Sequence, residues 1–255
     1  MSGAADGLPS DATRVSVAVE SGVAHVRLTR GRGNPLDLAT AEGLLRAARQ
    51  CRTAGAVLLT AAGPAFCVGG DLREFASAAD LRAHLDRVTG ALHEALRIFA
   101  GLDAPLVAAV RGAVAGAGLG LLGVADLVVA AEDATFTAAY TGIGYTPDAG
   151  VSWSLPRLVG PRLALDLLLT NRRLTAPEAH AAGLVTSVAA DPDQAAALLA
   201  ERLAGPAFAV TKRLVRAGRT ESFARQLDAE ARALAEAAVS PSGRDGVAAF
   251  LARRL

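Results

Sequence analysis

Residues 65–72 read AFCVGGDL, residues 110–130 read VRGAVAGAGLGLLGVADLVVA, and these two stretches decide the expected fold. The first stretch follows a short apolar strand predicted at residues 56–60, and the second begins at the end of another, predicted at residues 105–110. Their glycines let a ligand atom approach the backbone closely. The second stretch also reads as the start of a helix, whose first N–H groups have no partner within the helix. Together they predict an α/β fold with a ligand site at loops that follow strands.

Strand and helix patterns alternate on both sides of these stretches. Residues 15–19 and 23–29 alternate around Ser21-Gly22, which predicts a hairpin, and residues 38–52 and 80–100 have helical periodicity. The order strand, strand, helix then repeats. We expect a disordered tail at residues 1–12, an α/β core at 13–191 and a separate helical subdomain at 192–255, because the pattern beyond Pro192 is helical throughout.

Composition excludes several classes of function. The 255 residues carry 26 basic and 25 acidic side chains, so no strong overall field would attract nucleic acid or an anionic membrane. The longest apolar run, residues 113–125, is too short to span a bilayer. We therefore expect neither nucleic acid nor a membrane as partner. Cys51 and Cys67 are the two cysteines, and no secretory leader precedes the first strand, which favours the cytoplasm.

The two glycine-rich segments suggest a particular chemistry. If each contributed one free N–H group to the same point, the pair would form an oxyanion hole. Such a hole stabilises the negative charge that develops on a thioester oxygen, and it requires no particular side chain. The two segments are therefore a candidate oxyanion hole.

Five stretches, in order, carry a family resemblance. Besides the two quoted above, they are FTAAYTGIGYTPDAGVSWSLPRLVG at 136–160, TAPEAHAAGLV at 175–185 and PAFAVTKRLV at 206–215. The chain resembles the crotonase (enoyl-CoA hydratase/isomerase) superfamily from Val15 to the GVAAFLARR ending. The resemblance implies a spiral of repeated strand-strand-helix (ββα) units, a C-terminal helical trimerisation subdomain, and assembly as a homotrimer or a dimer of trimers.

The resemblance also implies a set of site residues. The oxyanion donors would be the N–H groups of Gly70 and Ala117. The adenine of coenzyme A would lie against the backbone around Phe66, Val68 and Gly69, and its phosphates would be held by basic residues. Our candidates for the phosphates are Arg32 and Lys212, the latter being the only lysine. Coenzyme A enters as part of the substrate, so we expect no separate cofactor, and no metal-ligand spacing occurs.

The catalytic acids depart from the family's hydratases, which use two glutamates. Gly120 and Tyr140 stand at the matching positions, and neither can activate water as a carboxylate does. Moving a double bond needs a single acid/base, and Asp148 in the PDAG loop resembles the acid of the isomerase branch and of the ring-epoxide isomerases. We therefore expect isomerisation through Asp148. Tyr140 and Tyr145 are candidates to orient the substrate or donate a hydrogen bond.

Several alternatives stay open. Asp148 could be a turn residue after proline; Asp71 is expected to cap the next helix; His84 and His93 are expected to be ordinary helix residues. A hydratase (lyase) with atypical acids, or a catalytically silent acyl-CoA binder, would fit the same segments. Residues 118–123 also match the dinucleotide-binding pattern GxGxxG, which would fit a nicotinamide oxidoreductase. Alternatively, the small residues of these segments merely allow close helix packing.

Overall fold

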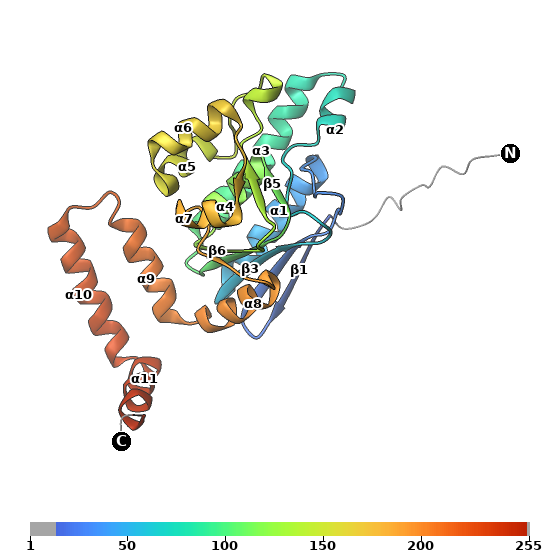
Figure 1. Cartoon of the computed structure of the whole chain (residues 1–255). Helices are drawn as coiled ribbons and strands as arrows, with labels where there is room; N and C mark the ends of the chain where they lie inside the picture. The colour runs from blue at the N-terminus through green and yellow to red at the C-terminus, as the bar shows by residue number, and fades with distance from the viewer. Residues whose placement is uncertain (1–13, 254–255) are drawn as a thin grey trace. The chain divides into compact units, whose positions relative to one another are not determined.

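The computed structural model describes residues 14–253, so the tail predicted at residues 1–12 lies outside the described part. Its main body is an α/β fold built around a six-stranded sheet (Figure 1). The strand order is β1-β2-β3-β4-β6-β9, and every neighbouring pair is parallel except the β1–β2 hairpin. The strands are β1 (Val15–Glu20), β2 (Val23–Leu28), β3 (Ala56–Ala61), β4 (Leu106–Val110), β6 (Leu127–Ala130) and β9 (Ser187–Val188).

The predicted hairpin is confirmed, and its turn has a clear cause. Ser21 and Gly22 both adopt positive φ values, 50° and 81°. A two-residue turn with this backbone matches the right-handed twist of the strands that it joins. The β1–β2 ladder therefore pairs Val15 with Leu28 and continues to Glu20 and Val23.

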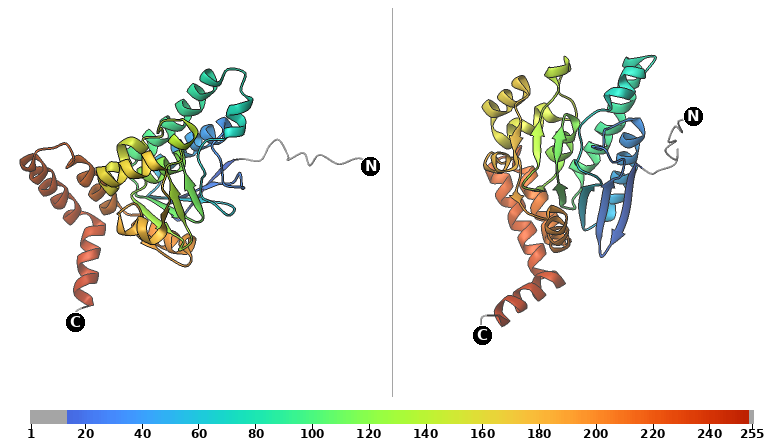
Figure 2. Two further views of the ribbon diagram at one scale, coloured as in Figure 1. Left: turned by 45° about the horizontal axis from the view of Figure 1, so that its top comes forward. Right: turned by 45° about the vertical axis from the view of Figure 1, so that its right-hand side comes forward.

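Both faces of the sheet are buried at its central strands, β3 and β4. Successive strand residues point to opposite sides, so each face packs against different helices. In β3, Val57 and Leu59 pack with α1 (Leu38–Gln50) and α3 (Leu81–Gly101). The alternate residues Ala56 and Leu58 pack instead with α8 (Pro192–Leu203). Helices thus cover each face, as Figures 1 and 2 show. This explains why these strands read as continuous apolar runs.

The predicted repeat of strand, strand and helix is present. A second sheet, in the order β5-β7-β8, comprises β5 (Ala113–Ala115), β7 (Thr135–Thr137) and β8 (Leu174–Thr175), and Cys67 forms a further parallel bridge with Val114. Each turn of the chain therefore contributes to the large sheet, then to the small one, then to a helix. The helices of three successive turns are α2 (Leu72–Ser77), α4 (Ala117–Val124) and α5 (Val151–Val159). This is the expected spiral.

The last part of the main body closes the spiral. Between the strands lie the short turns η1 (Cys51–Thr53) and η2 (Thr141–Ile143), and α5 is followed by α6 (Pro161–Thr170). Thr175 caps α7 (Ala176–Ala181), and Glu178 completes a capping box with it. The hydrogen bonds from Thr175 hold the pKa of Glu178 below its usual range.

The boundary of the helical subdomain differs from the expected one. The first compact unit ends at Ala204 and the second begins at Gly205, whereas the sequence pattern predicts a boundary at 191/192. The reason is α8, whose Ala196 and Ala200 are fully buried against the sheet. The second unit contains α9 (Pro206–Ala217), α10 (Phe223–Val239) and α11 (Pro241–Ala252).

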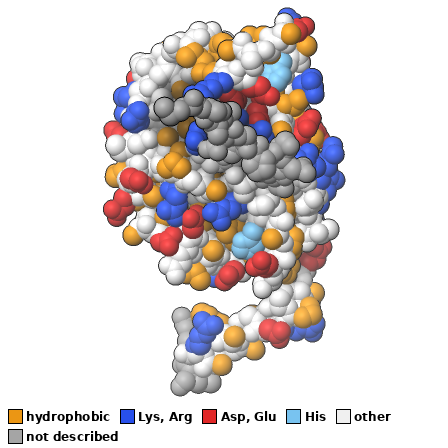
Figure 3. All heavy atoms as spheres, turned by 90° about the vertical axis from the view of Figure 1, so that its right-hand side faces the viewer, with side chains coloured by type: hydrophobic (Ala, Val, Ile, Leu, Met, Phe, Trp, Pro, Cys, Tyr) orange, Lys and Arg blue, Asp and Glu red, His pale blue; other side chains and the backbone are white. Residues whose placement is uncertain are grey.

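The surface fits the balanced composition. On the face that Figure 3 displays, the side chains of Lys and Arg are interspersed with those of Asp and Glu. In the range 14–253, no helix is long and apolar enough to cross a membrane.

Candidate active site

The two glycine-rich segments lie side by side. Cys67 donates from its N–H to the carbonyl of Ala113 at 3.4 Å, and its own carbonyl accepts from Ala115 N–H at 2.9 Å. Gly118 allows this close approach, because a Cβ atom there would collide with the Cys67 carbonyl oxygen. The structure therefore brings together the two loops from which the sequence predicts the oxyanion donors.

The Gly70 amide is oriented by its neighbours. The Gly69 carbonyl accepts from Leu36 N–H at 2.7 Å, and Asp71 N–H donates to the Leu36 carbonyl at 3.1 Å. In a planar trans peptide the C=O and the next N–H point in opposite directions. The Gly70 N–H therefore points away from Leu36, and no acceptor for it is found within the described part of the chain. Gly69 itself has a φ of 89°, and a Cβ there would lie 3.4 Å from the nitrogen of Ala117.

The Ala117 amide is the first N–H of α4. Gly116, the preceding residue, has a φ of 53° and provides no side-chain cap. Ala117 is buried, and over residues 14–253 its N–H has no hydrogen-bond acceptor. A buried backbone donor without a partner is uncommon and carries the partial positive charge of the helix end. Gly70 and Ala117 thus each offer an unpaired N–H group on adjoining loops, and their role as oxyanion donors stays a prediction.

Asp71 braces this loop, as expected from its position. Its carboxylate caps α2 by accepting from the N–H groups of Arg73 and Glu74, and it forms an ion pair with Arg30 at 2.5 Å. Burial disfavours its ionised form, but the hydrogen bond from Arg30 and the two N–H groups outweigh burial and hold the pKa of Asp71 below its usual range. Asp71 is therefore a charged anchor immediately after Gly70.

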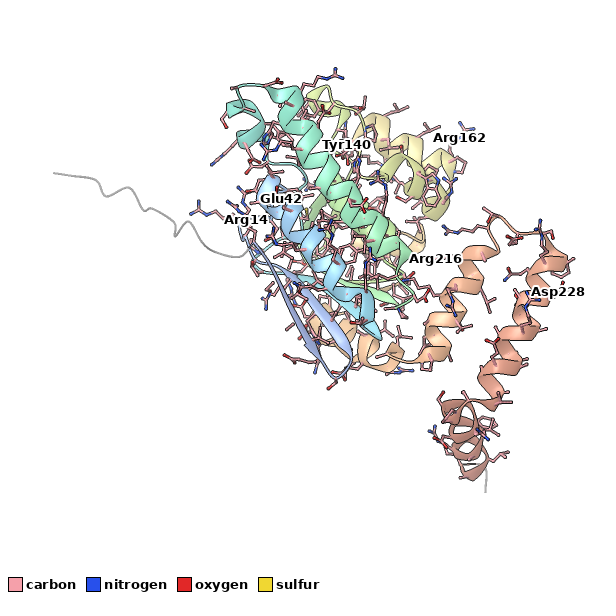
Figure 4. All side chains as sticks on the ribbon, turned by 180° about the vertical axis from the view of Figure 1, so that it is seen from behind. Arg14, Glu42, Tyr140, Arg162, Arg216 and Asp228 are labelled. Atoms are coloured by element: carbon pink, nitrogen blue, oxygen red, sulfur yellow. The ribbon has the colours of Figure 1, made fainter. Side chains whose placement is uncertain are left out.

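Asp148 lies in the loop before α5 and is held by Tyr140. The Tyr140 hydroxyl donates to Asp148 Oδ1 at 2.8 Å, so two of the residues predicted for the site are hydrogen-bonded to each other. Burial, followed by the negative charge of Asp148, raises the pKa of Tyr140, so the phenol keeps its proton and acts as a donor. Tyr140, labelled in Figure 4, is 7% exposed. Its hydroxyl is thus already engaged by the protein's own carboxylate.

Gly120 shows why a hydratase-type acid is missing on α4. A Cβ atom at this position would lie 2.5 Å from both the Cβ and the carbonyl oxygen of Ala149. The turn that follows Asp148 therefore occupies the space into which a side chain from residue 120 would project. The candidate carboxylate, Asp148, therefore comes from the turn and not from the helix, and its catalytic role stays a prediction.

His93 was not among the predicted site residues. It lies on α3, and its Nε2 accepts a hydrogen bond from Ala149 N–H at 3.2 Å. Contact between residues so far apart in the sequence cannot be read from helical periodicity. A second unpredicted residue is Asn34, which is fully buried and whose side-chain amide donates to the carbonyls of Ala62 and Ala65. It fixes the loop that precedes the first glycine-rich segment.

The predicted coenzyme A residues have different surroundings. Arg32 is exposed on a loop next to the first segment, where Val68 N–H donates to the Gly33 carbonyl at 2.9 Å. Val68 is 39% exposed, but the Phe66 side chain is fully buried in the core, so at Phe66 only backbone could meet a ligand. Tyr145 is 37% exposed. Lys212 is buried and belongs to α9 in the second unit.

Cys67 can be assigned a structural role. Burial raises the pKa of its thiol to about 12, so it stays protonated and unreactive near neutral pH.

No cluster of three or more potential metal ligands is found among residues 14–253.

Comparisons with known proteins agree with this architecture. A family model described as enoyl-CoA hydratase/isomerase matches residues 18–255. The chain belongs to the enoyl-CoA hydratase/isomerase family. It is 37% identical over 244 residues to a protein named "probable enoyl-CoA hydratase" from Rhodobacter capsulatus, covering 92% of this chain and 94% of that one. It is 37% identical over 208 residues, 78% of each chain, to the 1,2-epoxyphenylacetyl-CoA isomerase of Escherichia coli.

Solved structures of the enoyl-CoA hydratase/isomerase family support the fold. The crystal structure of enoyl-CoA hydratase from Bacillus anthracis has a TM-score of 0.85 and 28% identity, covering 94% of this chain and 96% of that chain. Family membership displaces the dinucleotide hypothesis for residues 118–123. Gly118 and Gly120 instead allow α4 to pack closely against Cys67 and Ala149. The packing explanation therefore holds for these two glycines, beside the oxyanion hypothesis for the helix start.

Proposed function

We propose that the protein is an enoyl-CoA double-bond isomerase with Asp148 as its acid/base. The observation that carries this proposal is the pair formed by Asp148 and Tyr140, located where the turn packs against Gly120 and next to α4. A carboxylate held by one hydrogen bond at Oδ1 keeps lone pairs on Oδ2 for a proton. The carboxylate is therefore fixed in place and still able to act as a base.

The reaction requires two proton transfers by one group. Asp148 removes a proton from C2 of a 3-enoyl-CoA, and the electron pair of that C–H bond delocalises over C2 and the thioester carbonyl. The amides of Gly70 and Ala117 donate to the resulting oxyanion. Asp148 then returns the proton to C4 while the double bond moves from C3–C4 to C2–C3. The product is a 2-enoyl-CoA, and since only protons move, no metal or redox cofactor is needed.

Hydration is the less favoured reaction, although relatives carry that name. It would need a positioned water and a second acid/base. Residue 120 has no room for a carboxylate beside Ala149, and the Tyr140 hydroxyl is committed to Asp148. The relative named 1,2-epoxyphenylacetyl-CoA isomerase supports isomerisation more generally and suggests aryl ring-epoxide thioesters as a second substrate class.

The test is a product assay with a single-atom change at the base. We expect the protein to convert 3-hexenoyl-CoA to 2-hexenoyl-CoA, and Asp148→Asn to lower kcat by about 100- to 10,000-fold. Asp133→Asn, at an exposed site, is the matched control. Unchanged turnover in Asp148→Asn would remove the proposed base. A 3-hydroxyacyl product from crotonyl-CoA would favour a hydratase, and binding without turnover in the parent protein would favour the silent acyl-CoA binder.

Coenzyme A binding is part of the same proposal. The adenine would rest on the backbone of residues 66–70, and Arg32 would contact a phosphate from its exposed loop. Lys212 is the second candidate for the phosphates. Replacing Arg32 with alanine should raise KM for the acyl-CoA and leave kcat nearly unchanged, because the phosphates are remote from the reacting carbons.

Assembly and setting complete the proposal. We expect a homotrimer or a dimer of trimers, acting in cytoplasmic fatty-acid metabolism. Support for assembly comes from the exposed apolar side chains of the second unit, described below. Support for a reducing compartment comes from Cys51 and Cys67, which are both buried and free of disulfides.

A further inference from the structure

The turn after Asp148 has an uncommon backbone. Ala149 adopts a φ of 51° and Gly150 a φ of 74°, so two successive residues lie in the left-handed region. For a residue with a Cβ atom this conformation is disfavoured and persists when surrounding contacts impose it. Ala149 is also almost completely buried, so its N–H group is out of reach of solvent. The conformation of the turn thus depends on specific anchors.

The Gly150 carbonyl accepts from the N–H groups of Trp153 and Ser154, and three further hydrogen bonds hold Asp148 and Ala149. Tyr140 donates to the Asp148 carboxylate, Val151 N–H donates to the Asp148 carbonyl at 2.9 Å, and Ala149 N–H donates to His93 Nε2 at 3.2 Å. The last bond is the one that links the turn to α3. Because a backbone N–H always donates, Nε2 must be the unprotonated ring nitrogen of a neutral imidazole that carries its proton on Nδ1.

We infer that His93 is a positioning residue for Asp148, which anchors the Ala149 amide through Nε2 and so fixes the carboxylate under the reacting carbons. The inference rests on the proposed role of Asp148 as the base. His93 is assigned no proton transfer of its own, because the nitrogen that would accept a proton is occupied by the Ala149 N–H. Without this acceptor the amide would be buried and unpaired, and the turn would shift to satisfy it.

The role depends on an acceptor at one position and not on imidazole chemistry. Glutamine can place its side-chain oxygen near the position of Nε2 and accept the same hydrogen bond. Leucine occupies a similar volume but has no acceptor. Comparison of His93→Gln with His93→Leu therefore separates the hydrogen bond from packing and from acid/base chemistry.

The experiment measures kcat and KM of both variants and of Asp148→Asn with 3-hexenoyl-CoA. A misplacement on the order of 1 Å can cost up to about 100-fold in rate, so His93→Leu should lower kcat by about 10- to 100-fold with KM nearly unchanged. His93→Gln should restore most of that loss. A parental kcat in His93→Leu, or equal losses in both variants, would overturn the inference.

A measurement on the unaltered protein covers the case in which His93→Leu does not fold. NMR spectra of ¹⁵N-histidine-labelled protein at neutral pH would show the His93 ring signals, which are identified by their absence from the spectrum of His93→Gln. These signals should report a protonated Nδ1 and an unprotonated Nε2. A protonated Nε2 would contradict the inference. Failure of the proposed function has a different signature, because Asp148→Asn would then keep its turnover whatever the His93 variants do.

Discussion

Gly120 is the residue at which the structure argues most directly against a second carboxylate. Even one extra carbon would meet Ala149 at 2.5 Å, in a region that is closely packed. We expect Gly120→Ala to lower the free energy of unfolding by about 1–3 kcal/mol, as overpacking in a core commonly does. Because Ala149 adjoins Asp148, isomerase kcat should fall as well. Thermal unfolding and steady-state kinetics would measure the two effects.

Gly90 provides a matched control for this prediction. It also lies within a helix, α3, but a Cβ atom there would meet nothing within 4 Å. Gly90→Ala should raise the free energy of unfolding by about 0.5–1 kcal/mol through its effect on backbone entropy. If Gly120→Ala were stabilised to the same extent, the turn at Ala149 would not be packed as described.

Asp71 gives a prediction with a defined pH dependence. Asp71→Asn keeps a good N-cap residue and removes the charge that pairs with Arg30. Since the folded protein lowers the pKa of Asp71, its contribution is complete above the unfolded pKa of about 3.9 and is lost as pH falls through the folded value. We expect Asp71→Asn to lose about 1 kcal/mol at pH 7, a modest amount because Arg30 is partly solvated. The loss should shrink in acid.

Asp80 tests whether that pH dependence belongs to the ion pair. It caps α3 by accepting from Ala83 N–H at 3.0 Å at an exposed site. Asp80→Asn replaces one good cap with another, so its effect on the unfolding free energy should stay below about 0.5 kcal/mol. Chemical denaturation at several pH values would compare the two variants. An equal and equally pH-dependent loss in both would assign the effect to capping.

Elements with strong local signals were predictable, whereas contacts between distant elements were not. The hairpin at Ser21-Gly22 and the capping box at Thr175 are specified within a few residues of sequence. The meeting of the two glycine-rich segments followed from their shared position after parallel strands. His93 could not be found in this way, because its partner Ala149 lies on a different element, and the burial of Phe66 is likewise set by tertiary packing.

The helix α8 shows the same limit at a domain boundary. Its helical periodicity resembles that of the helices that follow, but Ala196 and Ala200 are fully buried on the sheet. Ala200→Asp would place an unpaired charge there and should lower the free energy of unfolding by about 3 kcal/mol or more. Leu198→Asp, at a 55% exposed position of the same helix, should change it by less than about 0.5 kcal/mol. Similar losses in both variants would contradict the assignment of α8 to the main body.

At the scale of the whole molecule, the second unit carries apolar side chains that its own helices leave exposed. On α10, Phe223, Leu227 and Leu234 recur at helical spacing and are 79%, 48% and 72% exposed. Gln226, which borders this apolar stripe on α10, donates from its side-chain amide to the Leu214 carbonyl of α9. Apolar side chains arranged in this way are typical of helices that pack against another chain. They are the basis for expecting assembly.

Leu234→Glu tests this expectation. The parent protein should sediment or elute at three or six times the monomer mass of 25.8 kDa. A charge on the apolar face should shift the distribution toward smaller species. Arg232→Glu, at an exposed polar position of the same helix, should leave the assembly unchanged. Light scattering at several protein concentrations would measure the masses, because dissociation depends on concentration. A monomeric parent, or full assembly in Leu234→Glu, would show that this face of α10 is not an interface between copies of the chain.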